Sequence, residues 1–352
     1  MSSNTVSNVS FGFNDISGGQ NDIIAYEDDT INWLAGNTDT NPLFVDTANG
    51  DYYLKDQSLL IGAGIDSIEI SDTWYYAPST DITGNKRPNP SGSKPDIGAY
   101  ENQYGEPQHN TLIYVSKIGT DSETTFGFSS DPFKTIQAGI DYSWDGDTVF
   151  VHAGTYDENI SLTKSIVLEG ENREITIIDG GQNDRVVSIN GDSIIFQGFT
   201  VQNGLGALSN YGGGIRVDSN NPNSYIVIDD CIITGNMDGP NNGGNGGGGI
   251  YLGSQATTYI SNTIIRDNYG YNGGGICASS EVILRNVLLH DNQSANQGGG
   301  IFVSANDDFS IFNSTIYNNT GQNGGGAYTQ GIFNVENCIF YNNQITGGGC
   351  GG

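Results

Sequence analysis

Basic residues are scarce in this sequence. Lys and Arg together number 12 against 40 Asp and Glu, so the formal net charge is −28. A surface this acidic repels nucleic acid and anionic membranes, and we expect neither as a partner. It also repels anionic polysaccharides unless a cation such as Ca²⁺ bridges them. We interpret the charge as a solubility charge suited to salty or calcium-rich extracellular water.

Long apolar runs and a leader pattern are also lacking. No run approaches the ~20 residues that a membrane-spanning helix needs. The first residues, Met1 to Asn4, lead straight into repeat-like sequence without a signal-peptide pattern. We therefore expect an excised piece of a secreted or cell-surface protein of bacterial type, with its natural start elsewhere.

Cysteine is rare, with four residues. Cys231 and Cys338 occupy the same position of a repeat, four copies apart. At ~4.8 Å per stacked strand this is roughly 19 Å, whereas a disulfide needs Cα atoms within about 7 Å. We expect both, and Cys277, to be unpaired. Cys350 either opens a further coil or is an added thiol, and the sequence leaves both open. The three histidines are too scattered for a zinc site.

Glycine is abundant, with 52 residues, but it has no Gly-X-Y period, which excludes collagen. Many of the glycines belong to a repeat in residues 212–343. Each copy begins with three glycines and one apolar residue: Gly212 to Ile215, Gly247 to Ile250, Gly273 to Ile276, Gly298 to Ile301 and Gly324 to Ala327.

A seven-residue phrase, Asn/Asp-x-x-apolar-x-x-Asn, closes each copy. It recurs after 32, 24, 27 and 24 residues. A near-fixed period of this size is typical of a solenoid, in which stacked neighbours complete one apolar core. We expect the glycines to form tight corners with φ > 0 and the last Asn of each phrase to stack in an amide ladder. The phrases are Asp230 to Asn236, Asn262 to Asn268, Asn286 to Asn292, Asn313 to Asn319 and Asn337 to Asn343.

The same phrase occurs near the N-terminus, where Asn8, Phe11 and Asn14 fill its Asn, apolar and Asn positions. The chain is therefore in permuted order, which fits three readings: a piece of a tandem array, a permuted single domain whose residues 1–101 pack on its own far end, or an end-to-end contact between copies. The predicted divisions are 1–101 for a last coil and closing module, with 17–40 irregular, 102–111 for a linker, 112–346 for a capped β-helix, and 347–352 for a Gly-rich tail or a further coil.

A short helix near 131–141 is predicted to cap the second β-helix. Asp131 suits the N-cap and Pro132 the first helical position. Phe133, Ile136 and Ile140 share one face, which would cover the open apolar end of the solenoid. From residue 112 to 343 we expect about nine coils, or roughly 43 Å at ~4.8 Å each.

Two stretches carry a resemblance to known families. Pro132 to Gln137, followed by Asp145 to Val149, resembles the N-terminus of the right-handed parallel β-helix superfamily that includes the pectate lyases. The glycine-Ile and apolar-x-x-Asn phrases resemble the repeats of polymorphic outer-membrane proteins. The resemblance implies an all-β fold, a right-handed parallel β-helix (β-solenoid), but a fold does not define a function.

Residues 41–101 resemble the closing module of bacterial surface β-helix proteins that carry a choice-of-anchor C-terminus. The matching phrases include Asp81 to Pro88 and Asp96 to Glu101. The sequence departs from the family at Leu59, where Pro is usual, and at Gly62, where Asp is usual. Any role of that Asp is lost here.

Stacking would bring two carboxylates together at one coil corner. Asp267 and Asp291 fall in one column, about one strand spacing or ~5 Å apart, a distance that suits Ca²⁺ or a shared-proton acid/base pair. The pectate lyases use carboxylate-bound Ca²⁺ and a basic proton acceptor, which Arg266 or Arg285 would imitate. The alternative is ordinary turn chemistry with an exposed ion pair.

Three functions remain open. The first is a non-catalytic, adhesin-like structural protein of the cell surface, whose last coil (Asn337, Phe340, Asn343) meets the coil at Asn8, Phe11 and Asn14 of another copy or of an adjacent tandem domain. Such head-to-tail contacts form fibres. The second is a polysaccharide lyase or glycoside hydrolase. The third is a Ca²⁺-dependent carbohydrate-binding module. No cofactor other than Ca²⁺ is expected.

Overall fold

The computed structural model describes residues 8–23, 30–122, 125–206, 212–219, 221–239, 246–253, 255–304 and 308–347. Two compact units divide the chain between His109 and Asn110. Each unit has its own core and is described by itself. The division falls in the predicted linker, but Asn102 and Gln108 of that segment bond to Leu54 and Asp56 and so belong to the first unit.

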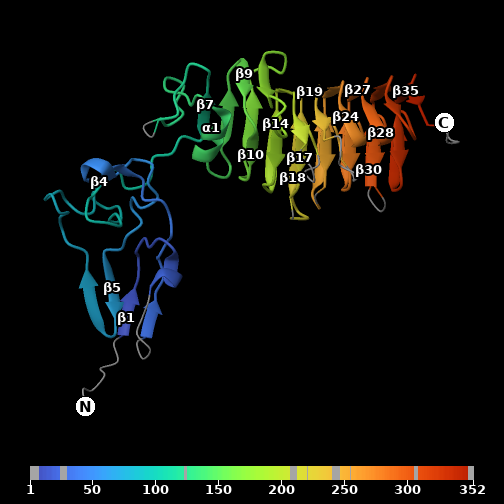
Figure 1. Cartoon of the computed structure of the whole chain (residues 1–352). Coiled ribbons are helices and arrows are strands. Elements are labelled where there is room, and N and C mark those ends of the chain that lie inside the picture. Colours follow the sequence, from blue (N-terminus) through green and yellow to red (C-terminus); the bar gives the residue numbers. More distant parts are fainter. Residues whose placement is uncertain are drawn as a thin grey trace. The chain divides into compact units, whose positions relative to one another are not determined.

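The second unit is a right-handed parallel β-helix, as predicted (Figure 1). Successive strands of its sheets pair in parallel, one coil upon the next. In the largest sheet the described residues form nine strands, as the expected nine coils require. These are β7 (Leu112–Val115), β8 (Thr148–Val151), β11 (Val167–Gly170), β14 (Ser193–Gln197), β18 (Tyr225–Asp229), β22 (Thr257–Ser261), β26 (Val282–Arg285), β30 (Asp308–Phe312) and β34 (Ile332–Glu336).

The second sheet holds the middle of each seven-residue phrase. Its strands are β9 (Gly154–Asp157), β12 (Thr176–Asp179), β15 (Thr200–Gln202), β19 (Ile232–Thr234), β23 (Ile264–Arg266), β27 (Leu288–His290), β31 (Thr315–Tyr317) and β35 (Ile339–Tyr341). A short third sheet follows it along each coil, with β16 (Leu205–Gly206), β20 (Met237–Asp238), β24 (Tyr269–Asn272), β28 (Gln293–Gln297), β32 (Thr320–Gly321) and β36 (Gln344–Ile345).

In the fourth sheet, five of the seven strands begin directly after a glycine triplet. Its strands are β10 (Ile160–Leu162), β13 (Val187–Ile189), β17 (Ile215–Val217), β21 (Ile250–Leu252), β25 (Ile276–Ala278), β29 (Ile301–Val303) and β33 (Ala327–Thr329). The first glycine of a triplet turns the corner, as at Gly273 with φ +64°. A Cβ on the second, Gly274, would lie 2.4 Å from backbone oxygens of neighbouring coils, so only glycine fits there.

Apolar side chains form columns inside the coils. Ile228, Ile260, Leu284 and Ile311 follow one another across paired strands and are fully buried. Each such side chain contributes roughly 1.5–3 kcal/mol by leaving water. The next member of the column, Val335 on the last coil, is 46% exposed. The core therefore continues to an apolar end face at β34 and β35.

Residues with positive φ explain the polar positions of the phrase. Its first residue has φ between 47° and 55° in all five copies, and the residue before its final Asn is also left-handed. Asn, Asp and Gly tolerate this conformation better than other residues. The residues are Asp230, Asn262, Asn286, Asn313 and Asn337 at the first place, and Gly235, Asp267, Asp291, Asn318 and Asn342 at the second.

Helix α1 (Ile136–Tyr142) lies at the first coils and buries Ile136 and Ile140, and Phe133 is buried before it. The predicted start at Asp131 and Pro132 is wrong, because Thr135 is the N-cap and its side chain accepts from Ala138 N. The reason is tertiary: Phe133 N donates to Tyr114 O at 2.9 Å, which holds the preceding residues extended beside β7.

Charged side chains from the coils hold both ends of α1. The Glu158 carboxylate accepts from Ile136 N at 2.9 Å and Gln137 N at 3.0 Å. Lys164 Nζ donates to Ile140 O, Asp141 O and Ser143 O at 3.0, 2.6 and 2.6 Å. The signs match the helix dipole, which favours an anion at the N-terminus and a cation at the C-terminus.

We expect Lys164→Met to lower the stability of this cap by about 1–2 kcal/mol, because three carbonyls lose a charged donor. Amide hydrogen exchange of residues 136–142 checks this and should become faster. Lys134→Met, on an exposed side chain, is the matched control and should leave the exchange unchanged. Equal exchange rates in both variants would contradict the proposed cap.

The first unit also contains stacked coils. Its β1 (Asn8–Phe11) pairs in parallel with β2 (Thr30–Trp33). Residues 31–37 were predicted to be irregular, yet Leu34 and Asn37 repeat the apolar and final Asn positions of the phrase. The match was hidden because Ile31 stands where other copies carry Asn or Asp. Gly36, with φ +81°, takes the left-handed place.

The remainder of the first unit is built from hairpins and turns. Its elements are the 3-10 helices η1 (Gly19–Asp22) and η2 (Thr47–Asn49), and the strands β3 (Phe44–Asp46), β4 (Asp51–Leu54), β5 (Ser67–Ile70) and β6 (Thr73–Tyr76). β3–β4 and β5–β6 pair antiparallel. Leu54, Leu60 and Ile61 form a small buried core.

Candidate functional site

The predicted carboxylate column is exposed and already paired. Asp267 and Asp291 follow β23 and β27 with φ 55° each. Asp267 Oδ2 lies 2.5 Å from Arg266 Nη1, and Asp291 Oδ2 lies 2.5 Å from His290 Nδ1. A hydrogen bond from Asn318, followed by one from His290, lowers the pKa of Asp291. This shift favours the ionised form of Asp291, so Asp291 is not poised as a general acid.

The remaining basic candidate does not join these carboxylates. Arg285 stacks over the Phe312 ring, with 4.7 Å between its guanidinium carbon and the ring centroid. The part of the chain that the structure describes contains no group of three or more His, Cys, Asp or Glu side chains that suits a metal ion. Calcium at Asp267 and Asp291 thus stays a sequence prediction without added support.

The cysteines do not supply a nucleophile. Cys231 and Cys277 are buried and free, and Cys338 is free and partly buried, in agreement with the predicted absence of bridges among them. Burial raises the pKa of Cys231 to about 12 and that of Cys277 further. Their thiols therefore remain protonated at neutral pH. Cys350 lies outside the described residues.

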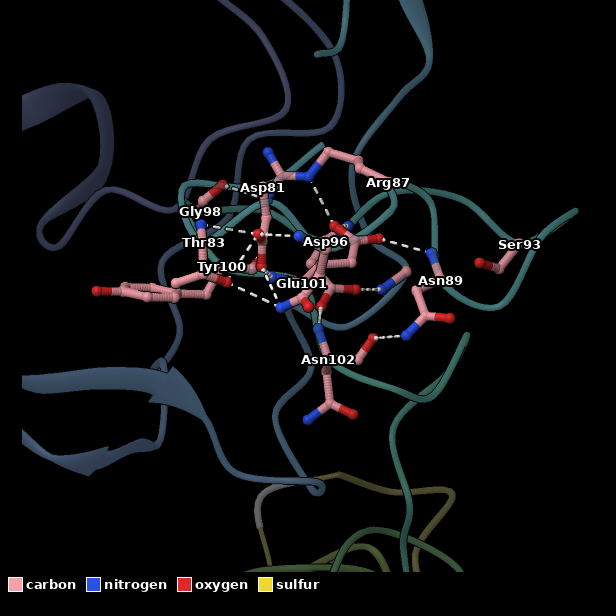
Figure 2. Close-up of polar contacts among 12 residues, drawn as sticks. Asp81, Thr83, Arg87, Asn89, Ser93, Asp96, Gly98, Tyr100, Glu101 and Asn102 are labelled. Carbon is pink, nitrogen blue, oxygen red and sulfur yellow. Dashed lines mark hydrogen bonds and ion pairs between the residues drawn. The ribbon is translucent and has the colours of Figure 1, made fainter. Parts of the chain in front are cut away.

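A buried charged network occupies the closing module of the first unit (Figure 2). Glu101, with a side chain 0% exposed, accepts from Arg87 Nε at 2.7 Å and from Asn89 N at 3.0 Å. Arg87 Nη2 donates to Gly98 O and Tyr100 O. The Arg87–Glu101 pair thus joins the phrase Asp81 to Pro88 to the phrase Asp96 to Glu101.

Asp81 and Asp96 complete this network. Burial raises the pKa of Asp81, but hydrogen bonds from Thr83, Asn85 and Glu101 N outweigh it, so the pKa lies well below its usual value. Asp96 accepts from Gly62 N at 2.8 Å and Asn102 N at 2.6 Å. Gly62 has φ +64°, and a Cβ there would meet Gly105 O at 2.2 Å.

The phrases Asp81 to Pro88 and Asp96 to Glu101 are recognisable in the sequence, but nothing in them predicts this buried network. Burial raises the pKa of Asp96 to about 6 despite its two backbone hydrogen bonds. A carboxyl whose pKa is higher in the folded state binds protons preferentially there, so stability increases as pH falls through 6 toward the unfolded value.

We therefore expect the first unit to gain about 1 kcal/mol of stability between pH 7 and pH 5. Urea unfolding followed by tryptophan fluorescence in a Trp144→Phe background measures this, since the remaining Trp33 and Trp74 lie in the first unit. Asp96→Asn should abolish the increase, because it removes the titrating group. A variant that keeps the full pH dependence would assign it to another group.

The predicted interface residues lie at two coil ends, one in each unit. Asn337, Phe340 and Asn343 belong to the last described coil, where Phe340 is 41% exposed although Ile316 before it is fully buried. Phe11 and Asn14 belong to the first described coil of the first unit, together with the backbone of Asn8. Both coils have a neighbour on one side among the described residues.

The predicted amide ladder is confirmed. In the second unit, from Asn268 onward, the Oδ1 of the final Asn of a phrase accepts two hydrogen bonds at 3.0–3.1 Å. The donors are the backbone N and the Nδ2 of the final Asn in the preceding phrase. Four of these asparagines are essentially buried. The ladder consists of Asn236, Asn268, Asn292, Asn319 and Asn343.

Comparisons with known proteins give little beyond the fold. No protein-family model matches the chain. No curated protein matches it either. The chain resembles the pectin methylesterase PemA from Erwinia chrysanthemi, with 15% identity and a TM-score of 0.39, over 60% of this chain and 66% of that one. It resembles pectin methylesterase from carrot, with 14% identity and a TM-score of 0.41, over 68% and 85%.

Likenesses at this level carry no argument about activity. The described residues also contain no helix long and apolar enough to cross a membrane. The parallel pairing of its stacked sheets makes the second unit a parallel β-helix.

Proposed function

We propose that this protein is an extracellular structural, adhesin-like β-helix that acts through contacts at its coil ends. The observation that carries the proposal is the last coil. Its inward column residues Val335 and Phe340 are 46% and 41% exposed, whereas the corresponding Ile311 and Ile316 are fully buried. Among the described residues no strand pairs with the outer edges of β34 and β35, and an apolar end with such strand edges is a ready contact surface. The net charge of −28 suits salty extracellular surroundings.

The alternative, a polysaccharide lyase or glycoside hydrolase, lacks a supporting site geometry. A general acid needs a raised pKa and a base within reach of one reacting atom. Asp267 and Asp291 are instead exposed, and each is bonded to the basic residue next to it. Such surface ion pairs contribute about 0–1 kcal/mol and are common at turns.

Carbohydrate binding without turnover is the second candidate. A cavity of about 370 Å³ in the first unit is lined by Phe44, Tyr52 and Tyr100 together with Ile82. Tyr52 is 49% exposed and Ile82 is 70% exposed. Exposed aromatic rings beside an apolar wall suit the flat faces of sugar rings. The net charge favours a neutral glycan over an anionic one.

An activity panel tests these functions. We expect no unsaturated product from uronate polysaccharides, no new reducing ends and no methanol from methyl-esterified pectin. Turnover that Asp291→Asn abolishes would overturn the structural proposal in favour of the enzyme. A glycan array with and without a calcium chelator tests the second candidate, and chelator-sensitive binding without turnover would support a Ca²⁺-dependent module.

A further inference from the structure

An interior rung of the amide ladder makes contacts in two directions. Asn292 Oδ1 accepts from Asn268 N at 3.1 Å and Asn268 Nδ2 at 3.0 Å. On the other side, Asn292 N and Nδ2 both donate to Asn319 Oδ1 at 3.0 Å. Asn292 Nδ2 also reaches back to Ile265 O at 2.9 Å. The ladder is therefore polar, with acceptors toward the preceding coil and donors toward the following one.

The last rung of the second unit has its preceding half only. Asn343 Oδ1 accepts from Asn319 N and Nδ2 at 3.0 Å each, and Asn343 Nδ2 donates to Ile316 O at 2.9 Å. Among the described residues, no acceptor on a following coil meets Asn343 N or the second hydrogen of Nδ2. The backbone oxygen of Phe340 lies three residues before Asn343. Among the described residues it accepts from no Asn Nδ2, whereas the equivalent Ile265 O of an interior coil accepts from Asn292 Nδ2.

The first rung of the first unit has the opposite half. Asn14 N and Nδ2 donate to Asn37 Oδ1 at 3.0 and 3.1 Å. Asn37 Nδ2 donates to Phe11 O at 2.9 Å, as Asn292 Nδ2 does to Ile265 O. These contacts match an interior rung, and the ladder runs in the same direction. Within the described part of the chain, Asn14 Oδ1 receives no donor from a preceding coil.

We infer that Asn343 of one copy and Asn14 of a second copy form the missing rung, so that the ladder continues from chain to chain. Asn343 N and Nδ2 donate to Asn14 Oδ1, and Asn14 Nδ2 donates to Phe340 O. Every donor and acceptor then has the partner of an interior rung. This inference rests on the proposed function and names its partner, a second copy of this chain.

The apolar residues agree with this junction. Phe340 and Phe11 occupy the same place in the phrase, three residues before the rung Asn.

Contacts of this kind are heterologous, so copies add in one direction. Each copy carries a charge of −28, which opposes association at low ionic strength, and salt screens this repulsion. We therefore expect the 352-residue chain to form oligomers that grow with concentration and with salt. Sedimentation velocity and negative-stain imaging measure both effects.

Single-end variants make the test specific. Phe340→Glu places a charge on one end face and Val9→Glu, at a side chain 42% exposed, on the other. Each should raise the concentration for half-assembly about tenfold or more, because the contact buries an unpaired charge. In a mixture of the two variants, one variant keeps an unmodified Asn14 end and the other an unmodified Asn343 end. These two ends can still pair, so assembly should stop at the dimer. Ile118→Glu, at a side chain 91% exposed, adds the same charge elsewhere and should assemble normally.

Three results would overturn the junction. The first is a compact monomer at every concentration and salt level tested. The second is assembly that Phe340→Glu blocks and Val9→Glu does not, which indicates end faces that pair with themselves. The third is unchanged assembly in both variants. These results leave the catalytic panel untouched, and turnover in that panel would sink the structural function without affecting the junction. Circular dichroism of each variant establishes that it folds.

Discussion

Replacing Asn268 with alanine is expected to lower the free energy of unfolding of the β-helix by about 4 kcal/mol. Asn268 is 1% exposed. Its Oδ1 accepts from Asn236 N and Nδ2, and its Nδ2 donates to Ile233 O and Asn292 Oδ1, all within 2.9–3.1 Å. Alanine removes all four bonds and takes this partner from Asn236 N and Ile233 O, which are buried, and each orphan costs about 1–3 kcal/mol.

Asn286→Gly is the matched control for this substitution. Asn286 lies in the same repeat but is exposed, and its φ of 55° suits glycine. Its change should stay within about 0.5 kcal/mol. Urea unfolding followed by far-ultraviolet circular dichroism compares the two. If Asn268→Ala were as mild as the control, the rungs would only fill space and the ladder would not stabilise the stack.

Arg87→Met is expected to destabilise the first unit by about 3–5 kcal/mol. The substitution keeps most of the apolar stem but leaves the Glu101 carboxylate, which is fully buried, without its cation. A buried charge that loses its partner retains the full cost of leaving water. Gly98 O and Tyr100 O also lose the donor Arg87 Nη2.

Tryptophan fluorescence in a Trp144→Phe background measures the first unit alone, because Trp33 and Trp74 then remain. Lys86→Met, at the exposed neighbour, is the control and should have little effect. Adding Glu101→Gln to Arg87→Met should recover part of the loss, since the second change removes the buried charge. No recovery would assign the effect to lost packing instead of the ion pair.

The coil itself was predictable from the sequence because its requirements are local. A left-handed residue is needed at Asn262 and again at Asp267, and only a few residue types tolerate that conformation. The repeat period then places like residues in columns. A column of Asn or Ile stabilises the stack only when each residue contacts the same residue type on the next coil. The amide ladder and the buried apolar columns followed from this repetition alone.

Pairings that do not repeat were decided by the tertiary structure. Helix α1 begins at Ile136 instead of Pro132 because β7 holds Phe133 extended, a contact that the helical pattern does not encode. The column pattern predicts a pairing of Asp291 with Asp267, yet at the folded corner each carboxylate contacts the side chain of the residue before it, Arg266 or His290. At exposed turns the direction of each side chain decides which groups pair. The position of a residue in its column does not determine that direction.

Repetition in the sequence predicts the solenoid, the Asn ladder and the likeness between the coil at Asn14 and the coil at Asn343. The complementarity of these two rungs comes from the fold: among the described residues, Asn343 keeps unused donors and Asn14 an unused acceptor. A phrase fixes which residue stands at the rung, but the polarity of the ladder depends on which neighbouring coil each amide faces.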